Sequence, residues 1–303
     1  MGTTWVVTGC GGQLGSALVA QLEGEGESVQ ALSHAELDVA EPAAVRSLLS
    51  SLAPGPKIVV NAAAFTHVDR CEREPEAARR GNAQAPAVLA AACREAGARL
   101  VHLSTDYVFP GDADRPYRET DPTGPRSVYG HTKLAGEEAV RNASEDFLVV
   151  RTSWVFGRGR NFIASILAQA ELRRRGEVQG PLRVVSDQRG RPTYAADLAR
   201  GIRRLVEAGA RGLYHVANAG EATWWDLARA SLDEAGYRGL EVERIRTRDL
   251  EAGAPRPAWS VLDCSKAEGA GVRMRHWREA VAAYLGSGDS PISSAHQKRI
   301  SND

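Results

Sequence analysis

The chain has 303 residues, of which 43% are hydrophobic, enough for one large domain together with a smaller second one. Lysine and arginine balance aspartate and glutamate at 38 each, so no overall charge indicates a nucleic-acid or membrane-surface partner. The sequence shows no signal peptide, no apolar run of transmembrane length and no disulfide or metal spacing among its four cysteines, which predicts a cytoplasmic protein with reduced thiols.

The chain begins with a strand, a glycine turn and a helix, in the order that a dinucleotide-binding site needs. The β-branched and aromatic run 4–8 predicts a first strand. Gly9, Gly12 and Gly15 follow at spacings of three, and an apolar-periodic helix continues after them. Glycines allow a tight turn and a close approach of a pyrophosphate to the helix N-terminus. An ordinary glycine-rich turn is the alternative, and the position directly after a strand favours the cofactor site.

The predicted second strand, 28–32, ends without the carboxylate that NAD sites commonly use to bind the ribose hydroxyls. Ser33 and His34 stand there instead, so a 2′-phosphate would meet no negative charge, although no arginine is placed to bind one. Asp38 and Val39 follow and are expected near the adenine. We therefore expect NADPH to be used at least as well as NADH.

Strands and helices continue to alternate along the chain. A third strand is predicted at 57–60, and small residues that would let a cofactor lie close follow it, although tight packing explains them equally well. A fourth strand is predicted at 99–103 and a fifth at 147–152. This alternation predicts an α/β fold with a Rossmann-type, doubly wound parallel sheet, in which ligands bind at the carboxyl ends of the strands.

The stretch 104–133 carries the candidate catalytic residues. Thr105 lies at the end of the fourth strand, and Tyr129 and Lys133 stand four residues apart on one face of a predicted helix. A cation beside a phenol favours the phenolate, which would bring the Tyr129 pKa from about 10 toward neutral pH. The spacing alone is compatible with a solvated helix face and an aromatic anchor. In combination with the glycine turn it indicates an acid–base site for reduction of a ketone or oxidation of an alcohol.

The second half of the chain has a less regular pattern. Helices are predicted at 162–172, 195–208, 224–235 and 274–285, and strands at 183–186, 213–217 and 241–246. We expect residues 1–153 and 186–218 to form the dinucleotide-binding domain, and residues 154–185 and 219–286 to form a smaller, discontinuous α/β substrate domain. The polar, serine-rich residues 287–303 are predicted to be a disordered tail.

The motifs together resemble the dTDP-4-dehydrorhamnose reductase family, within the extended short-chain dehydrogenase/reductase superfamily. The segments that carry the resemblance are 11–15, 60–69, 104–109, 129–137, 151–156 and 187–193. The Ser-Thr-Asp-Tyr-Val-Phe run at 104–109 and the Leu-Ala-Gly-Glu run at 134–137 are more specific than the superfamily motifs. The resemblance implies NAD(P)H-dependent reduction of the C4 ketone of a dTDP-4-keto-6-deoxyhexose, dTDP-4-dehydro-L-rhamnose in the first instance.

The resemblance also implies residue roles. Tyr129 would donate the proton, Lys133 would be its pKa partner and bind the nicotinamide ribose, and Thr105 would tune the ketone contact. The cofactor-binding residues expected from motif and resemblance are Gly9, Gly12, Gln13, Leu14, Gly15, Ser33, Asp38, Val39, Ala62, Ala63, Ala64, Phe65, Thr66, Tyr129 and Lys133. The expected substrate-binding residues are Thr105, Asp106, Tyr107 and Trp154.

No metal is expected, because Ser16 and Ala17 stand where some members of the family carry the glutamate of a Mg²⁺-bridged dimer. A monomer or a homodimer is expected, with no nucleic-acid or membrane partner. Two other functions stay open. One is a 4-ketoreductase of a specialised deoxysugar pathway. The other is a non-catalytic NADP-binding regulatory subunit, like the similar beta subunit of methionine adenosyltransferase, and the intact Thr105, Tyr129 and Lys133 count against it.

Overall fold

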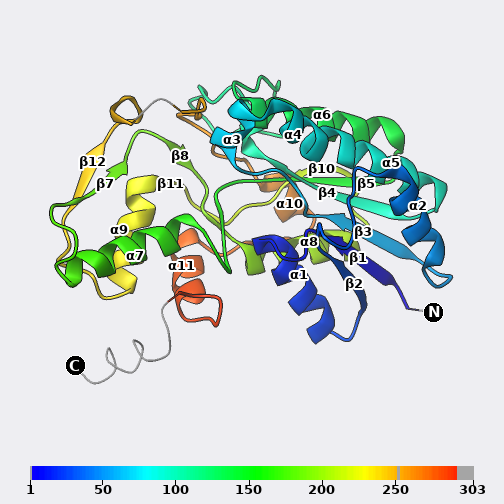
Figure 1. The fold of residues 1–303 in the computed structure, drawn as a ribbon, viewed down its shortest axis with the longest axis horizontal. Coiled ribbons are helices and arrows are strands. Elements are labelled where there is room, and N and C mark those ends of the chain that lie inside the picture. The colour runs from blue at the N-terminus through cyan, green and yellow to red at the C-terminus, as the bar shows by residue number, and fades with distance from the viewer. Residues whose placement is uncertain (1, 251–252, 292–303) are drawn as a thin grey trace.

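The structure is a computed structural model that describes residues 2–250 and 253–291 (Figure 1). A six-stranded parallel sheet in the order β10-β5-β4-β3-β1-β2 forms its larger part. The strands are β1 (Thr4–Thr8), β2 (Ser28–Leu32), β3 (Lys57–Asn61), β4 (Arg99–Thr105), β5 (Phe147–Thr152) and β10 (Gly212–His215). The expected α/β fold class is confirmed, and the strand predicted at 213–217 joins the sheet as β10 beside β5.

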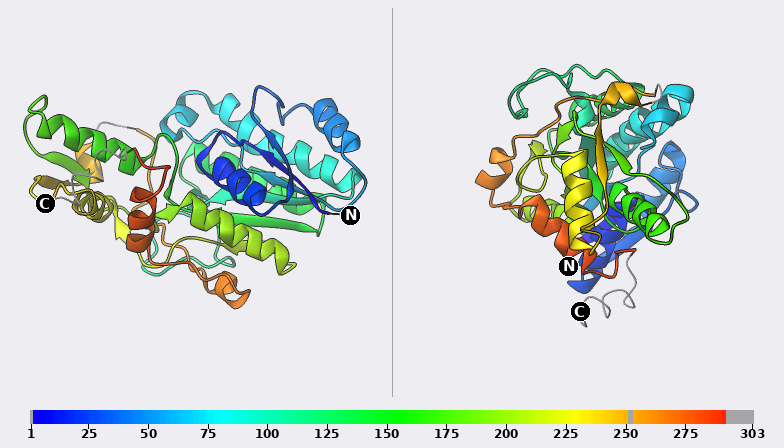
Figure 2. Two further views of the ribbon diagram at one scale, coloured as in Figure 1. Left: turned by 90° about the horizontal axis from the view of Figure 1, so that it is seen from below. Right: turned by 90° about the vertical axis from the view of Figure 1, so that its left-hand side faces the viewer.

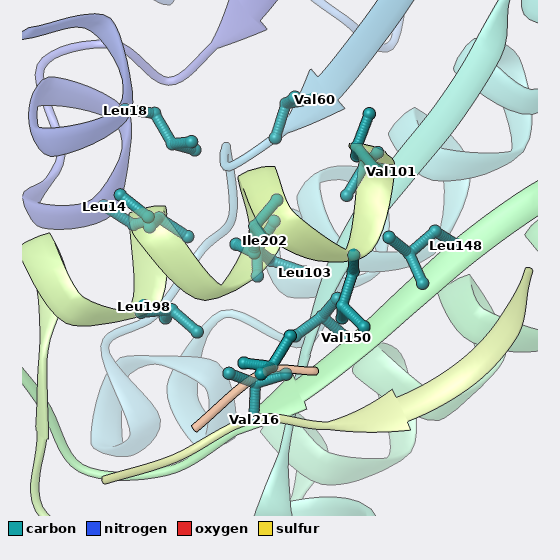
Figure 3. Packing of buried hydrophobic residues seen from close by; sticks show 14 of the residues in the cluster. Leu14, Leu18, Val60, Val101, Leu103, Leu148, Val150, Leu198, Ile202 and Val216 are labelled. Carbon is teal, nitrogen blue, oxygen red and sulfur yellow. The ribbon is translucent and has the colours of Figure 1, made fainter. Parts of the chain in front are cut away.

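Helices cover both faces of the sheet. One hydrophobic cluster lies between the sheet and the helices α1 (Gln13–Gly24) and α8 (Ala195–Glu207) (Figure 3). The strands contribute Val60 and Leu148 to it, and the helices contribute Leu18 and Ile202. A second cluster lies on the other face, under α2 (Pro42–Ser51), α5 (Ala85–Glu95) and α6 (Val128–Ala143). Burial on both faces is the reason that these strands read as continuous apolar runs rather than alternating ones.

The order of the strands reverses around β1. From β1 the chain passes to β2 on one side, and β3 then pairs with β1 on the other. Parallel sheets bind ligands in the crevice at the carboxyl ends of such neighbouring strands, because the two connections leave in opposite directions there. The glycine turn after β1 and the small residues after β3 both lie at this crevice.

A second group of elements lies beside the sheet with a core of its own (Figures 1 and 2). Its helices are α7 (Phe162–Arg174), α9 (Trp224–Glu234) and α11 (Trp277–Leu285), and its longer strands are β7 (Leu182–Val185) and β12 (Val242–Ile245). The strands predicted at 183–186 and 241–246 are these two, and they pair in parallel. The helix predicted from residue 274 begins at Trp277, because His276 caps it through the Arg278 N–H.

Short elements complete the fold. They are α3 (Val68–Arg73), α4 (Pro75–Arg79), the π-helix η1 (Arg80–Gln84), the 3₁₀ helices η2 (Asp106–Val108) and η3 (Thr247–Asp249), α10 (Ser265–Gly269), β6 (Val155–Phe156), β8 (Arg189–Gly190), β9 (Thr193–Tyr194) and β11 (Ala222–Thr223). No helix in residues 2–250 and 253–291 is long and apolar enough to cross a bilayer. Of the predicted tail, residues 292–303 lie outside the described residues, while the Tyr194 hydroxyl lies 3.3 Å from both Ser287 Oγ and Asp289 Oδ2.

A buried ion pair joins α6 to β5. Arg151 donates from Nε and Nη2 to the two carboxylate oxygens of Glu137, at 2.9 and 2.7 Å, and both side chains are at most 2% exposed. The guanidinium also lies over the Phe109 ring, 4.9 Å from its centroid. Removing one partner of a buried pair leaves an uncompensated charge in the interior, which costs far more than the pair contributes.

We therefore expect Glu137→Gln to lower the free energy of unfolding by roughly 3 kcal/mol, because Arg151 keeps its charge and loses its anion. Urea denaturation at neutral pH measures the change. Glu138→Gln, an exposed neighbour on the same helix, is the control and should stay within about 0.5 kcal/mol of the wild type. A Glu137→Gln protein as stable as this control would show that the pair does not anchor α6.

Candidate active site

The turn after β1 is shaped for close approach by a ligand. Gly9 has φ +73°, and a Cβ there would lie 2.7 Å from the Ala63 amide nitrogen. Gly12 precedes α1, and no side chain caps the first turn of that helix. The helix N-terminus therefore presents N–H groups and a positive dipole end at the carboxyl edge of the sheet, which suits a pyrophosphate.

The end of β2 differs from the expectation. The Glu36 carboxylate accepts hydrogen bonds from Ser33 N at 2.8 Å and from Ser33 Oγ at 2.7 Å. Both bonds, the backbone one first, lower the pKa of Glu36, so the group is ionised at neutral pH. The premise that no carboxylate stands at this strand end is wrong, because the turn after β2 brings Glu36 back to it. Ser33-x-x-Glu36 has the spacing of a capping box, the signal that could have revealed this contact.

Asp38 is also engaged by the protein itself. Arg80 on η1 binds Asp38 at 2.6 Å and Glu41 at 2.7 Å. Hydrogen bonds from the Ala40 backbone and then from Arg80 lower the pKa of Asp38. A guanidinium near the end of β2 was not foreseen, because Arg80 is 42 positions from Asp38 in the chain.

The loop after β3 is held by a buried asparagine that the sequence analysis missed. Asn82, fully buried on η1, accepts from Phe65 N at 2.8 Å and donates to Phe65 O at 3.0 Å and to Thr132 Oγ1 at 3.2 Å. These bonds tie the 62–66 loop to α6. The feature that marks Asn82 as a candidate functional residue is its π-helical turn rather than a sequence pattern, because such turns occur frequently at functional sites.

Thr105 and Asp106 form a small network at the end of β4. Thr105 Oγ1 donates to Asp106 Oδ1 at 2.9 Å and accepts from Tyr107 N at 3.2 Å. Asp106 is 2% exposed, and burial raises its pKa to about 6, although the Ser260 and Thr105 hydroxyls oppose this shift. The Tyr107 ring meets the Tyr129 ring edge-to-face, with centroids 5.4 Å apart.

Tyr129 and Lys133 lie on the same face of α6, as expected, but their pKa relation is not the expected one. Burial raises the pKa of Tyr129 and outweighs the lowering effect of the Thr105 hydroxyl, and the Asp106 carboxylate raises this pKa further. Lys133 is 3% exposed and donates to the Leu103 carbonyl at 2.5 Å. The expected lowering of the Tyr129 pKa toward neutrality is therefore wrong. Desolvation of a phenolate outweighs the effect of an ammonium directed at a backbone carbonyl.

These segments surround one cavity of about 480 Å³. The predicted site residues that line it are Gly12, Gln13, Leu14, Ala62, Ala63, Ala64, Thr66, Thr105, Asp106, Tyr107, Tyr129, Lys133 and Trp154. The predicted cofactor residues outside its lining are Gly9, Gly15, Ser33, Asp38, Val39 and Phe65. The lining residues that the sequence analysis did not propose are Val68, Leu103, Ser104, Thr152, Ser153, Val155, Leu198 and Trp224.

A second, larger cavity of about 1040 Å³ adjoins the first, and the two share Tyr107 and Trp224 in their walls. Its lining includes the cations Arg73, Arg183 and Arg256. Arg256 is also bound to Asp69 at 2.7 Å. The carboxylates Asp69 and Glu72 line it as well, so the cavity combines apolar walls with charges of both signs. Tyr107, which lines both cavities, contacts the Tyr129 ring.

The smaller cavity fits a nicotinamide dinucleotide. Ser104 Oγ and Thr152 Oγ1 line it, are buried and have no hydrogen-bond partner among the described residues. Buried polar atoms are rarely left unpaired, so these hydroxyls suit the polar groups of a ligand. The uncapped N-terminus of α1 offers N–H groups for the pyrophosphate of a dinucleotide. The close-packed Ala62–Ala64 loop lets the dinucleotide approach the backbone.

Fold and site together define a class. A parallel sheet of Rossmann type with a strand-end threonine and a Tyr–Lys pair around one cavity is the arrangement typical of oxidoreductases of the short-chain dehydrogenase/reductase type. The model of the RmlD substrate binding domain family matches residues 3–289, and the chain belongs to this family.

Relatives agree with this placement and confirm the resemblance to dTDP-4-dehydrorhamnose reductases. The chain is 43% identical over 300 residues to the dTDP-4-dehydrorhamnose reductase of Streptomyces griseus, covering 95% of this chain and 96% of the relative. It is 45% identical over 286 residues to a probable dTDP-4,6-dihydroxy-2-methyloxan-3-one 4-ketoreductase of Streptomyces antibioticus, covering 91% and 92%. A crystal structure of dTDP-4-dehydrorhamnose reductase from Bacillus anthracis with NADP has a TM-score of 0.86 at 31% identity, covering 94% and 99%.

Burial of Lys133 predicts how the free energy of unfolding depends on pH. Burial lowers its pKa from 10.5 to about 8, so between these values the unfolded chain binds a proton that the folded chain does not. Stability then rises with pH through that window. We expect the unfolding free energy of the wild type, relative to Lys133→Met, to increase between about pH 8 and pH 10. Urea denaturation at several pH values measures it.

Lys266→Met is the matched control, because Lys266 also donates to a backbone carbonyl, Leu213 at 2.7 Å, but lies at the surface. Its stability should run parallel to that of the wild type over this range. Parallel curves for Lys133→Met as well would contradict the lowered pKa of Lys133.

Proposed function

We propose that this protein reduces the C4 ketone of a dTDP-4-keto-6-deoxyhexose with NAD(P)H, dTDP-4-dehydro-L-rhamnose in the first instance. The observation that carries the proposal is the convergence of Thr105, Tyr129 and Lys133 on one cavity beside the glycine turn. Similarity to named dTDP-4-dehydrorhamnose reductases over more than nine-tenths of the chain supports the substrate class.

Tyr129 is the proton donor in this proposal. Its raised pKa keeps the phenol protonated at neutral pH, as a general acid requires. The bound cofactor supplies a hydride to the ketone carbon. Tyr129 passes its phenolic proton to the ketone oxygen, so that C=O becomes CH–OH, while Thr105 positions that oxygen and Lys133 holds the nicotinamide ribose.

The larger cavity is the proposed site of the dTDP moiety. Its arginines, Arg73, Arg183 and Arg256, provide positive charge for the two phosphates, and Tyr107 and Trp224 connect it to the smaller cavity. In this assignment residues 1–153 and 186–218 bind the dinucleotide, and residues 154–185 and 219–286 bind the sugar nucleotide. Asp106, Tyr107 and Trp154 would meet the sugar between them.

A second candidate, a 4-ketoreductase of a specialised deoxysugar pathway, is favoured by the 45% identity to the probable 4-ketoreductase of Streptomyces antibioticus. The two candidates share the chemistry and differ in which face of the sugar meets the nicotinamide. Incubation with dTDP-4-keto-6-deoxyglucose, with and without a 3,5-epimerase, separates them by the configuration of the product. A product that forms only with the epimerase supports the rhamnose assignment.

We expect the wild type to oxidise NADPH in that assay and Tyr129→Phe to lower kcat by roughly 10²–10⁴-fold, because the phenylalanine ring keeps the packing but has no proton to donate. NADPH binding, measured as Kd, should change little. Lys133→Ala should differ by weakening NADPH binding as well as slowing turnover. A Tyr129→Phe enzyme that keeps more than half its activity would end this assignment and favour a binding role for the cavity.

Cofactor choice should depend on Glu36. NADPH remains the proposed cofactor, with NADH also accepted, but the ionised carboxylate at the end of β2 disfavours a 2′-phosphate. We expect Glu36→Gln to raise the ratio of kcat/KM for NADPH to that for NADH by roughly tenfold, about 1.4 kcal/mol. Glu23→Gln, at the exposed end of α1, is the control for general charge removal. An unchanged ratio in Glu36→Gln would remove Glu36 from the cofactor site.

A further inference from the structure

We propose that the segment 187–193, together with Trp224, is a cradle that holds the Trp154 indole against the catalytic cavity, so that Trp154 orients the sugar nucleotide. The inference deepens the proposed function and rests on it for the identity of the ligand. It gives a role to a sequence motif, Asp187-Gln188-Arg189-Gly190-Arg191-Pro192-Thr193, that the chemistry of proton and hydride transfer leaves unused.

The backbone of Trp154 is strained. Among the described residues it is the one non-glycine residue with positive φ, +48°. A bulky side chain in this region is an outlier that persists only where the surroundings hold it. The motif supplies that hold, because Thr193 N donates to Trp154 O at 3.1 Å and Ser153 Oγ donates to Arg191 O at 2.8 Å.

The Trp154 ring is fixed by stacking. It lies parallel to the Trp224 ring, with centroids 3.7 Å apart and planes 6° apart, and Phe162 packs against Trp224 at 4.7 Å. A hydrogen bond fixes the position of the Trp224 ring, because its Nε1 donates to Gln188 Oε1 at 3.0 Å. Gln188 is 3% exposed and in turn donates to Thr247 Oγ1 at 3.0 Å. The second residue of the motif thus anchors the ring on which Trp154 rests.

Gly190 makes room for the indole. A Cβ at position 190 would lie 2.5 Å from Cε2 and 2.7 Å from Nε1 of Trp154, so any other residue would displace the ring. Trp154 lines the catalytic cavity, and its Nε1–H has no hydrogen-bond partner within residues 2–250 and 253–291. A free N–H donor, held in the cavity that also contains Tyr129, can orient a sugar ring relative to the proton donor.

The test uses three variants and one matched control. Gly190→Ala pushes on the indole, Gln188→Leu frees Trp224, and Trp224→Phe removes the stacking partner. Trp225→Phe is the control, because Trp225 is the next residue of the same helix but binds Val242 O and lies under Arg244, away from the cavity. Steady-state kinetics with the dTDP-4-keto sugar and NADPH, together with the Kd of NADPH, are measured for each.

We expect the three variants to lose roughly 10²-fold in kcat/KM, chiefly through a higher KM for the sugar nucleotide, with the NADPH Kd changing much less than that KM. Trp225→Phe should keep its kinetics. In a Trp154→Leu background, Gly190→Ala should have little further effect, because the atoms it displaces are gone. Equal losses in sugar and NADPH binding, or full additivity of the two substitutions, would overturn the cradle.

A spectroscopic readout needs no substrate. Stacked indoles give an exciton couplet in the far-ultraviolet circular dichroism spectrum. Wild type and Trp225→Phe should show it, Trp224→Phe and Trp154→Phe should lose it, and Gly190→Ala should weaken it. If the wild type shows the couplet and binds NADPH but reduces no dTDP-4-keto sugar, the proposed function fails while the stack stands. Wild-type kinetics with the sugar nucleotide in both Gly190→Ala and Gln188→Leu would refute the cradle itself, and if Gly190→Ala does not fold, Gln188→Leu decides.

Discussion

The buried ion pair between Glu137 and Arg151 is the interaction on which the rest of the site depends. α6 carries Tyr129 and Lys133, and β5 leads directly into the Trp154 turn, so the position of the proton donor relative to the substrate wall is set where these two elements meet. A bidentate carboxylate–guanidinium contact tolerates little displacement, because both charges are removed from water. Lys133, one turn before Glu137, binds the Leu103 carbonyl on β4 and ties the helix to the neighbouring strand as well.

The parallel topology then determines what meets at the carboxyl edge of the sheet. Turns after β1, β3, β4 and β5 all emerge on that side, which brings Gly12, Ala63, Thr105 and Trp154 around one cavity although they span most of the first half of the chain. The second group of elements closes this edge with Trp224 and adds the larger, arginine-lined cavity. The two cavities meet at Tyr107 and Trp224, and the smaller one contains the Tyr129 phenol.

Burial governs the ionisation of the site. It raises the pKa of Tyr129 and of Asp106 and lowers that of Lys133, so all three groups are shifted toward their neutral forms. For a reductase this is a useful direction, since the group that must give a proton is kept protonated. Hydrogen bonds offset the desolvation free energy of these buried ionisable groups. Examples are the bond from Thr105 to Asp106 and the bond from Lys133 to the Leu103 carbonyl.

The sequence by itself determined the alternation of strands and helices, the glycine turn after β1, the shared face of Tyr129 and Lys133, and a strand near 213–217, because each depends on periodicity or on spacing within a few residues. The tertiary structure alone decided that β7 pairs with β12, that Asn82 holds Phe65 against Thr132, and that Trp154 stacks on Trp224. It also reversed the expected direction of the Tyr129 pKa. The physical reason is the same in each case. Long-range contacts and desolvation depend on which segments exclude water together, and no local pattern encodes that.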